Sequence, residues 1–217
     1  MYKTVVFDLD GTLLNTLTDL ADAGNRLCRK YGWPTHERQA YRYFVGNGIP
    51  KLVERLAPAD QRTPAVLEAA LADFKRDYGQ HLRDTTAPYP GIPEMLAKLK
   101  ANGVQLAVFS NKADALAKEV VKDYFGTQYF TIVRGQMTGV APKPAAEGTN
   151  ALLQALHADP ASTLYVGDSN VDVETAHNAN LPCCGAGGGF RTREELNAAG
   201  AEYLAENSDE LYDVIMK

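Results

Sequence analysis

The sequence predicts an α/β fold: a mostly parallel sheet covered by helices on both faces, interrupted near its start by an all-helical insertion. From residue 92 onward, helical and strand patterns alternate to the end of the chain. That alternation is typical of a parallel sheet with crossover helices. Between residues 16 and 87 only helical periodicity is found, and no strand is indicated. We therefore expect a core formed by residues 1–15 and 88–217 and an inserted helical domain formed by residues 16–87.

The individual elements follow from periodicity and from helix end signals. A short apolar strand, residues 4–7, opens the chain, and the first helix of the insertion is expected to begin after an N-cap at Thr16 and to end at Gly32. Further insertion helices are expected over residues 35–44, from Pro50, and from Pro64 to about residue 78. In the core we expect helices 92–101, 113–124, 145–157, 171–179, 192–199 and 208–216, and strands 104–109, 129–133, 163–166, 181–184 and 202–205.

Composition narrows the class of protein. The chain has 217 residues, 22 Lys plus Arg against 27 Asp plus Glu, and 45% apolar residues, which is ordinary for a globular domain. The net charge of −5 argues against a nucleic-acid partner, and no apolar run approaches the roughly 18 residues of a membrane helix. We expect a cytoplasmic monomer or homodimer without membrane contact. Cys28, Cys183 and Cys184 lack zinc spacing and are expected to be buried thiols.

The most informative motif is Asp8-Leu9-Asp10-Gly11-Thr12, at the end of the first strand. Side chains two residues apart in an extended chain point the same way, so the two carboxylates emerge together. Like charges so placed repel unless a positive charge lies between them. Mg²⁺, which prefers oxygen ligands and commonly binds carboxylates together with substrate phosphate, suits the position.

Other polar residues fall at further junctions of the predicted sheet. Ser110-Asn111-Lys112 follows a strand ending at Phe109, Lys143 precedes a helix, and Gly167-Asp168-Ser169-Asn170-Val171-Asp172 follows the strand of residues 163–166. Ligands of open parallel sheets bind beyond the carboxyl ends of the strands. We therefore expect these residues to converge on one site, with Ser110 just before a helix N-terminus that favours anions.

In this order and spacing the motifs resemble those of the haloacid dehalogenase superfamily, and more closely its phosphoglycolate-phosphatase-like branch. The resemblance covers nearly the whole chain and implies a Rossmann-like core with a helical cap. It implies a phosphomonoester hydrolase that acts on a small soluble phosphate ester, with phosphoglycolate as the default substrate. Asp8 would be the nucleophile that forms an aspartyl-phosphate, and Asp10 would be the general acid and base.

The resemblance also implies the remaining roles. Ser110 and Lys143 would stabilise charge on the transferred phosphoryl group. Mg²⁺ would be held by Asp8, by Asp10 through its backbone carbonyl, and by Asp168, with Asp172 in support. Substrate-binding roles would fall to the residues Thr12, Asn111, Gly46, Asn47 and Gly48.

Several alternatives stay open on the sequence alone. For Asp172 and Asn111 a capping or supporting role is the alternative to a direct role at the site. Gly46-Asn47-Gly48 suits a plain interhelical turn as well as a substrate-binding loop. The stretch from Gly185 to Gly189 lacks the third glycine of a dinucleotide-binding loop, because Phe190 stands there. Two other functions compete: a mutase similar to β-phosphoglucomutase, which would use the same two aspartates, and a non-catalytic regulator that binds a phosphate ligand.

Overall fold

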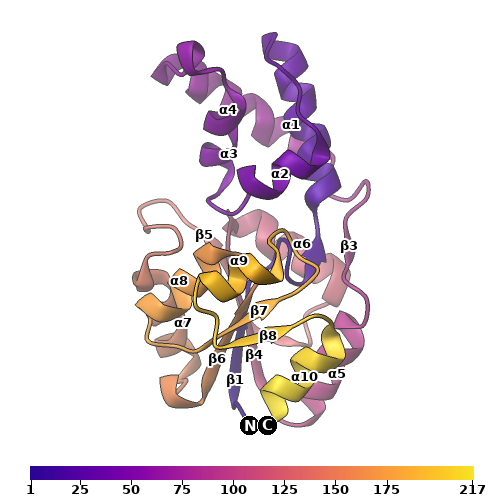
Figure 1. The fold of residues 1–217 in the computed structure, drawn as a ribbon, viewed down its shortest axis with the longest axis vertical. Helices are drawn as coiled ribbons and strands as arrows, with labels where there is room; N and C mark the ends of the chain where they lie inside the picture. Colours follow the sequence, from indigo (N-terminus) through magenta and orange to yellow (C-terminus); the bar gives the residue numbers. More distant parts are fainter. The chain divides into compact units, whose positions relative to one another are not determined.

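The computed structural model describes residues 1–217, which divide into two compact units: Met1–Asn15 with Pro88–Lys217, and Thr16–Ala87. We call the first the core unit and the second the helical unit (Figure 1). None of the helices combines the length and the hydrophobicity of a membrane-spanning segment.

The core unit is built on a six-stranded sheet in the order β5-β4-β1-β6-β7-β8, and all its paired strands are parallel. Its strands are β1 (Thr4–Phe7), β4 (Gln105–Ala113), β5 (Phe130–Gln136), β6 (Thr163–Gly167), β7 (Cys183–Ala186) and β8 (Tyr203–Ala205). The central strand β1 is buried along its whole length, as expected for a sheet covered on both faces. The predicted α/β fold is confirmed.

Helices connect the strands and cover the sheet (Figure 1). They are α5 (Ile92–Ala101), α6 (Asp114–Phe125), α7 (Ala146–Leu156), α8 (Asn170–Asn178), α9 (Arg193–Ala198) and α10 (Ser208–Met216), with a short 3₁₀ turn at Pro160–Ser162. One core cluster joins Leu152 of α7, Val173 of α8 and Leu196 of α9 to the sheet residues Val6 and Tyr165. Cys183 and Cys184 are buried free thiols, as is Cys28, and the prediction for the cysteines is confirmed.

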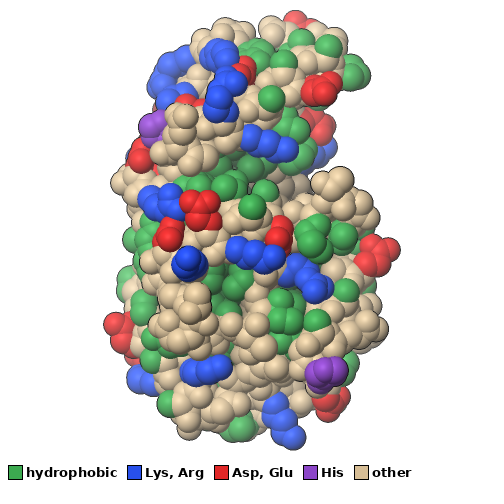
Figure 2. All heavy atoms as spheres, turned by 180° about the vertical axis from the view of Figure 1, so that it is seen from behind, with side chains coloured by type: hydrophobic (Ala, Val, Ile, Leu, Met, Phe, Trp, Pro, Cys, Tyr) green, Lys and Arg blue, Asp and Glu red, His purple; other side chains and the backbone are tan.

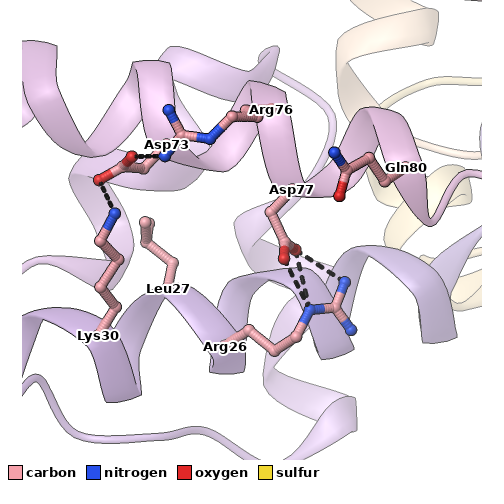
Figure 3. A pocket seen from close by; sticks show the side chains of 7 residues that line it. All are labelled: Arg26, Leu27, Lys30, Asp73, Arg76, Asp77 and Gln80. Atoms are coloured by element: carbon pink, nitrogen blue, oxygen red, sulfur yellow. Dashed lines mark hydrogen bonds and ion pairs between the residues drawn. The ribbon is translucent and has the colours of Figure 1, made fainter.

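The helical unit consists of α1 (Leu17–Tyr31), α2 (Arg38–Phe44), α3 (Ile49–Leu56) and α4 (Pro64–Gln80), with a 3₁₀ turn at Ala59–Gln61. Ion pairs join α1 to α4 around a pocket, where Arg26 faces Asp77 and Lys30 faces Asp73 (Figure 3). Arg76 pairs with Asp73 as well, so each cation of this pocket already has an acidic partner. The long helix α4 begins as the sequence predicts, because the Thr63 hydroxyl accepts a hydrogen bond from Val66 N–H and Pro64 follows it.

Two features differ from the sequence prediction. A second, two-stranded sheet pairs β2 (Leu14–Asn15) with β3 (Ala87–Pro88), where no strand was expected; strands of two residues are too short to leave a periodic signal. Thr16 precedes α1, but its hydroxyl makes no cap hydrogen bond. Its backbone, with φ −103° and ψ 3°, departs from the extended conformation of a capping residue.

The surface mixes charges of both signs. On the face shown in Figure 2, Lys and Arg side chains are interspersed with Asp and Glu and with apolar side chains. This mixture agrees with the small net charge of −5.

Candidate active site

Asp8 lies at the carboxyl end of β1 in the middle of the core sheet. Its N–H donates to the Val166 carbonyl of β6 at 2.8 Å, so the sheet register fixes the Asp8 backbone. The Asp8 side chain is 12% exposed, and its Oδ1 lies 2.8 Å from Lys143 Nζ. The first strand therefore places a nearly buried carboxylate against a buried ammonium group.

Lys143 is the charged centre of the site. Its Nζ lies 2.7 Å from Asp172 Oδ1 and donates to the Phe109 carbonyl at 3.4 Å. Its main chain is held by Asn111, whose Oδ1 accepts from Lys143 N–H at 2.9 Å and whose Nδ2 donates to the Lys143 carbonyl at 3.2 Å. The structure thus uses Asn111 to fix Lys143, and a contact of Asn111 with substrate stays a prediction.

Asp168 lies one residue beyond β6 and is held by two donors. The Thr12 hydroxyl donates to its Oδ1 at 3.2 Å, and Phe190 N–H donates to its Oδ2 at 2.7 Å. The loop that carries Phe190 approaches closely because Gly189 has no side chain: a Cβ there would overlap Asp168 and the Gly11 carbonyl. The glycine-rich stretch therefore serves to bring a backbone donor to Asp168.

Asp172 sits in the first turn of α8 and takes part in a capping box. Its Oδ2 accepts from Ser169 N–H at 3.1 Å and from the Ser169 hydroxyl at 2.6 Å, while Oδ1 faces Lys143. Both oxygens are therefore already engaged by protein groups. Asp172 is therefore both a capping residue of α8 and an ion-pair partner of Lys143, and its role in support of a metal ion stays a prediction.

Negative charge is in excess at the site. Oxygen atoms of Asp8, Asp168 and Asp172 lie within 4.8 Å of one another, and all three residues are buried. Burial, together with the charge of Asp172, raises the pKa of Asp8 to about 7 despite the nearby Lys143. Burial and the charges of Asp172 and Asp8 raise the pKa of Asp168 well above its usual value.

Lys143 balances only part of this charge. Burial alone would lower the pKa of Lys143, but the charges of Asp172 and Asp8 outweigh it and hold the pKa well above its usual value. With Asp10 and its own lysine partner included, four carboxylates face two ammonium groups. A divalent cation with a preference for oxygen ligands matches both the excess charge and the donor atoms. The residues present therefore fit a divalent metal ion.

Asp10 forms an ion pair with Lys112 and is not one of the three clustered aspartates. Lys112 Nζ lies 3.0 Å from its Oδ1 and 3.3 Å from its Oδ2, and the lysine side chain is 2% exposed. The ion pair thus holds the Asp10 side chain against Lys112 of β4, and a contact of the Asp10 main chain with a metal ion stays a prediction. The sequence motif Ser110-Asn111-Lys112 contains this lysine but does not indicate its role, because its partner lies about a hundred residues away in the chain.

Ser110 is placed differently from the prediction. It lies within β4, which runs to Ala113, and α6 begins only at Asp114. The strand continues past Phe109 because β4 still pairs with β5 there, up to Ala113 opposite Gln136, across a register shift. Ser110 is therefore not next to a helix N-terminus. Its hydroxyl accepts from Lys112 N–H at 3.2 Å and is buried.

Gly46, Asn47 and Gly48 form the turn between α2 and α3 of the helical unit. Gly46 and Gly48 have φ of 117° and 82°, values that glycine adopts readily. Asn47 Oδ1 accepts from Arg55 Nη2 at 2.9 Å, so the turn is anchored to α3. A role for this turn in binding substrate stays a prediction.

The parallel sheet carries a buried acidic cluster beyond its central strands, and the residues of this cluster could hold a metal ion. A family model described as haloacid dehalogenase-like hydrolase matches residues 5–186. The chain belongs to this family.

Several proteins similar to this chain are named phosphoglycolate phosphatase. Phosphoglycolate phosphatase of Chromobacterium violaceum is 32% identical over 98% of this chain and 96% of its own length. The enzyme of the same name from Vibrio parahaemolyticus is 28% identical over the same shares of the two chains. A solved structure from Lactobacillus delbrueckii subsp. bulgaricus, described as a candidate phosphoglycolate phosphatase, is similar with a TM-score of 0.93 and 28% identity, covering 99% of this chain and 98% of its own. The family and the enzyme class predicted from the sequence, a phosphatase, are confirmed.

Proposed function

We propose that this chain is a Mg²⁺-dependent phosphomonoester hydrolase that acts on a small, phosphoglycolate-like metabolite through an aspartyl-phosphate on Asp8. One observation carries the proposal: a buried Asp8 carboxylate lies 2.8 Å from Lys143 Nζ, inside a cluster that needs further positive charge. Substrate phosphate brings more negative charge, so the site requires a cation to admit it. A cytoplasmic location and a monomeric or homodimeric state stay predictions.

The first step is attack by an Asp8 carboxylate oxygen on phosphorus. The new bond joins that oxygen to phosphorus, the ester P–O bond breaks, and Asp10 donates its proton to the departing alcohol oxygen. In the second step water attacks the phosphorus of the acyl-phosphate, Asp10 takes the proton, and inorganic phosphate leaves as the Asp8 carboxylate re-forms. Asp10 thus acts first as acid and then as base.

The other buried groups handle charge and position. When bound, Mg²⁺ supplies electrostatic stabilisation of phosphate oxygens, and Asp8, Asp168 and the Asp10 main chain would hold it. Asp172 supports the site through Lys143, because its own oxygens are taken up by Ser169 and Lys143. Lys143 and the Ser110 hydroxyl offer donors for the equatorial oxygens of the transferred group.

The helical unit would act as a lid that excludes water and contacts the alcohol part of the substrate. Its Gly46–Gly48 turn is the proposed specificity loop; two glycines with positive φ shape it, and a hydrogen bond from Arg55 holds Asn47.

A panel of phosphorylated metabolites ranked by kcat/KM tests the proposed substrate class. We expect phosphoglycolate, or another short phosphorylated hydroxy acid, to rank highest, with inorganic phosphate released in an amount equal to the substrate consumed. Hexose 1-phosphate serves as the contrast, because an isomerised sugar phosphate would indicate a mutase. No release from any ester, together with binding of phosphate, would indicate a non-catalytic regulator.

Mg²⁺ should raise the melting temperature more at about pH 8 than at about pH 6. The pKa of Asp8 is raised from 3.8 to about 7, so at the lower pH the folded protein holds a proton there that the cation must displace. Between those two pKa values the folded state binds more protons than the unfolded state, and this group's contribution to stability therefore falls as pH rises. Thermal melts with Mg²⁺ and with EDTA measure the effect. A benefit from Mg²⁺ that shrinks toward higher pH would contradict the proposed site.

A further inference from the structure

Asp19 is a buried carboxylate of the helical unit that the proposed chemistry does not use. It occupies the third position of α1 and is 2% exposed. An acidic residue there commonly reaches back to its own N-cap to close a capping box. At α1 neither half of a box forms, because Thr16 makes no cap hydrogen bond and the Asp19 carboxylate accepts from Thr85 and Thr86 instead.

Thr85 and Thr86 lie at the other end of the helical unit in the sequence. Thr85 N–H and its hydroxyl donate to Asp19 Oδ1 at 2.9 and 2.5 Å. Thr86 N–H and its hydroxyl donate to Oδ2 at 2.9 and 2.7 Å. Each carboxylate oxygen thus receives one main-chain and one side-chain donor, and hydrogen bonds to a buried carboxylate are among the stronger ones in proteins.

The contact of Asp19 with Thr85 and Thr86 lies next to both places where the chain passes between the two units. The chain passes between the core unit and the helical unit only twice, at residues 15–16 and 87–88. Asp19 lies just after the first passage, Thr85 and Thr86 lie just before the second, and the flanking strands β2 and β3 pair with each other. The Asp19 hydrogen bonds and the pairing of β2 with β3 therefore join the two passages to each other.

We propose that Asp19 is a positioning residue for phosphoryl transfer, because it fastens the two passages so that the helical unit closes over the substrate in one orientation. The inference rests on the proposed role of the helical unit as a lid. Asp19 itself touches no reacting group. Its effect passes through Thr85 and Thr86 to the two connecting segments.

The test compares variants of the two threonine donors, of their acceptor Asp19 and of a control residue. Thr85→Val with Thr86→Val keeps the side-chain shape and removes both hydroxyl donors, whereas Thr85→Ser with Thr86→Ser keeps them. Asp19→Asn, which can accept at only one of its two side-chain positions, is the complementary variant. Thr63→Val is the matched control, because it removes a capping hydroxyl from the same unit at α4, away from the two passages.

Hydrogen exchange at the Thr85 and Thr86 amides and steady-state kinetics with phosphoglycolate provide the readouts. We expect the valine pair to expose both amides and to change KM and kcat together, lowering kcat/KM at least about tenfold. The serine pair and Thr63→Val should stay within about twofold of the unmodified enzyme. A merely structural role would reduce the folded fraction, so that kcat falls while KM is unchanged.

Either a fall in kcat alone, or unchanged kinetics in a variant whose two amides exchange freely, would overturn the proposal. Rapid exchange of these amides in the unmodified protein would overturn it as well. Absence of turnover in the unmodified protein would instead contradict the proposed function. The kinetics and amide exchange of the variants therefore test the role of Asp19, whereas turnover by the unmodified protein tests the proposed function.

Discussion

Replacing Asp8 by asparagine is expected to lower kcat by at least about 10⁴-fold, because no other side chain can take over as the nucleophile. Asparagine has nearly the same shape, and its amide does not form an acyl-phosphate. Phosphate release with the preferred ester measures the effect. Asp60→Asn, a change at an exposed aspartate of the helical unit, is the control and should leave activity unaltered.

The same variant should not be less stable in the absence of metal. Burial and the charge of Asp172 raise the pKa of Asp8 to about 7, so at about pH 8 the folded state carries an ionised group that it disfavours. Removing that charge should raise the melting temperature measured with EDTA and reduce the gain from Mg²⁺. An inactive variant that also melts earlier under these conditions would point to misfolding rather than to loss of the nucleophile.

Replacing Lys143 by methionine is expected to lower both stability and activity. The ammonium group lies 2.8 Å from Asp8 and 2.7 Å from Asp172 in a buried site. Removing one partner of a buried ion pair leaves uncompensated charge and typically costs about 3–5 kcal/mol. The variant should lose that much unfolding free energy in EDTA near neutral pH and should lose turnover even when Mg²⁺ restores part of the stability.

The pH dependence of this loss identifies its cause. Without Lys143 the remaining carboxylates bind protons more readily, so the stability difference from the unmodified protein should shrink as pH falls. Lys118→Met provides the contrast, because Lys118 pairs with Asp114 on the exposed surface of α6 and such pairs are worth at most about 1 kcal/mol. Equal costs for the two substitutions, measured by denaturant unfolding, would contradict the account of the buried cluster.

Much of the fold could be predicted because its signals are local. The alternation of strands and helices after residue 92 and the purely helical periodicity before it are properties of short windows. The ends of the strands depend instead on pairing with neighbouring strands that are distant in the sequence. Ser110 was expected beyond its strand, but β4 continues to Ala113 because β5 is still beside it.

The candidate site, like the fold, has features that the sequence predicts and features that it does not. Asp8 and Asp168 follow buried strands directly, so their convergence could be predicted from the sheet alone. The Lys112–Asp10 ion pair and the Phe190 N–H donor to Asp168 could not, because each joins residues whose proximity depends on the packed structure. The Asp19 contact with Thr85 and Thr86 spans more than sixty residues and has no local signal at all.

Direct capture of the phosphoryl-enzyme tests the central claim most sharply. Enzyme mixed with ³²P-labelled ester and Mg²⁺ is quenched in acid within a single turnover, and the labelled peptide is identified by mass spectrometry. We predict label on the peptide that contains residue 8, released by hydroxylamine as expected for an acyl-phosphate, and no label on Asp8→Asn. Label on another residue, or normal turnover by Asp8→Asn, would contradict the account.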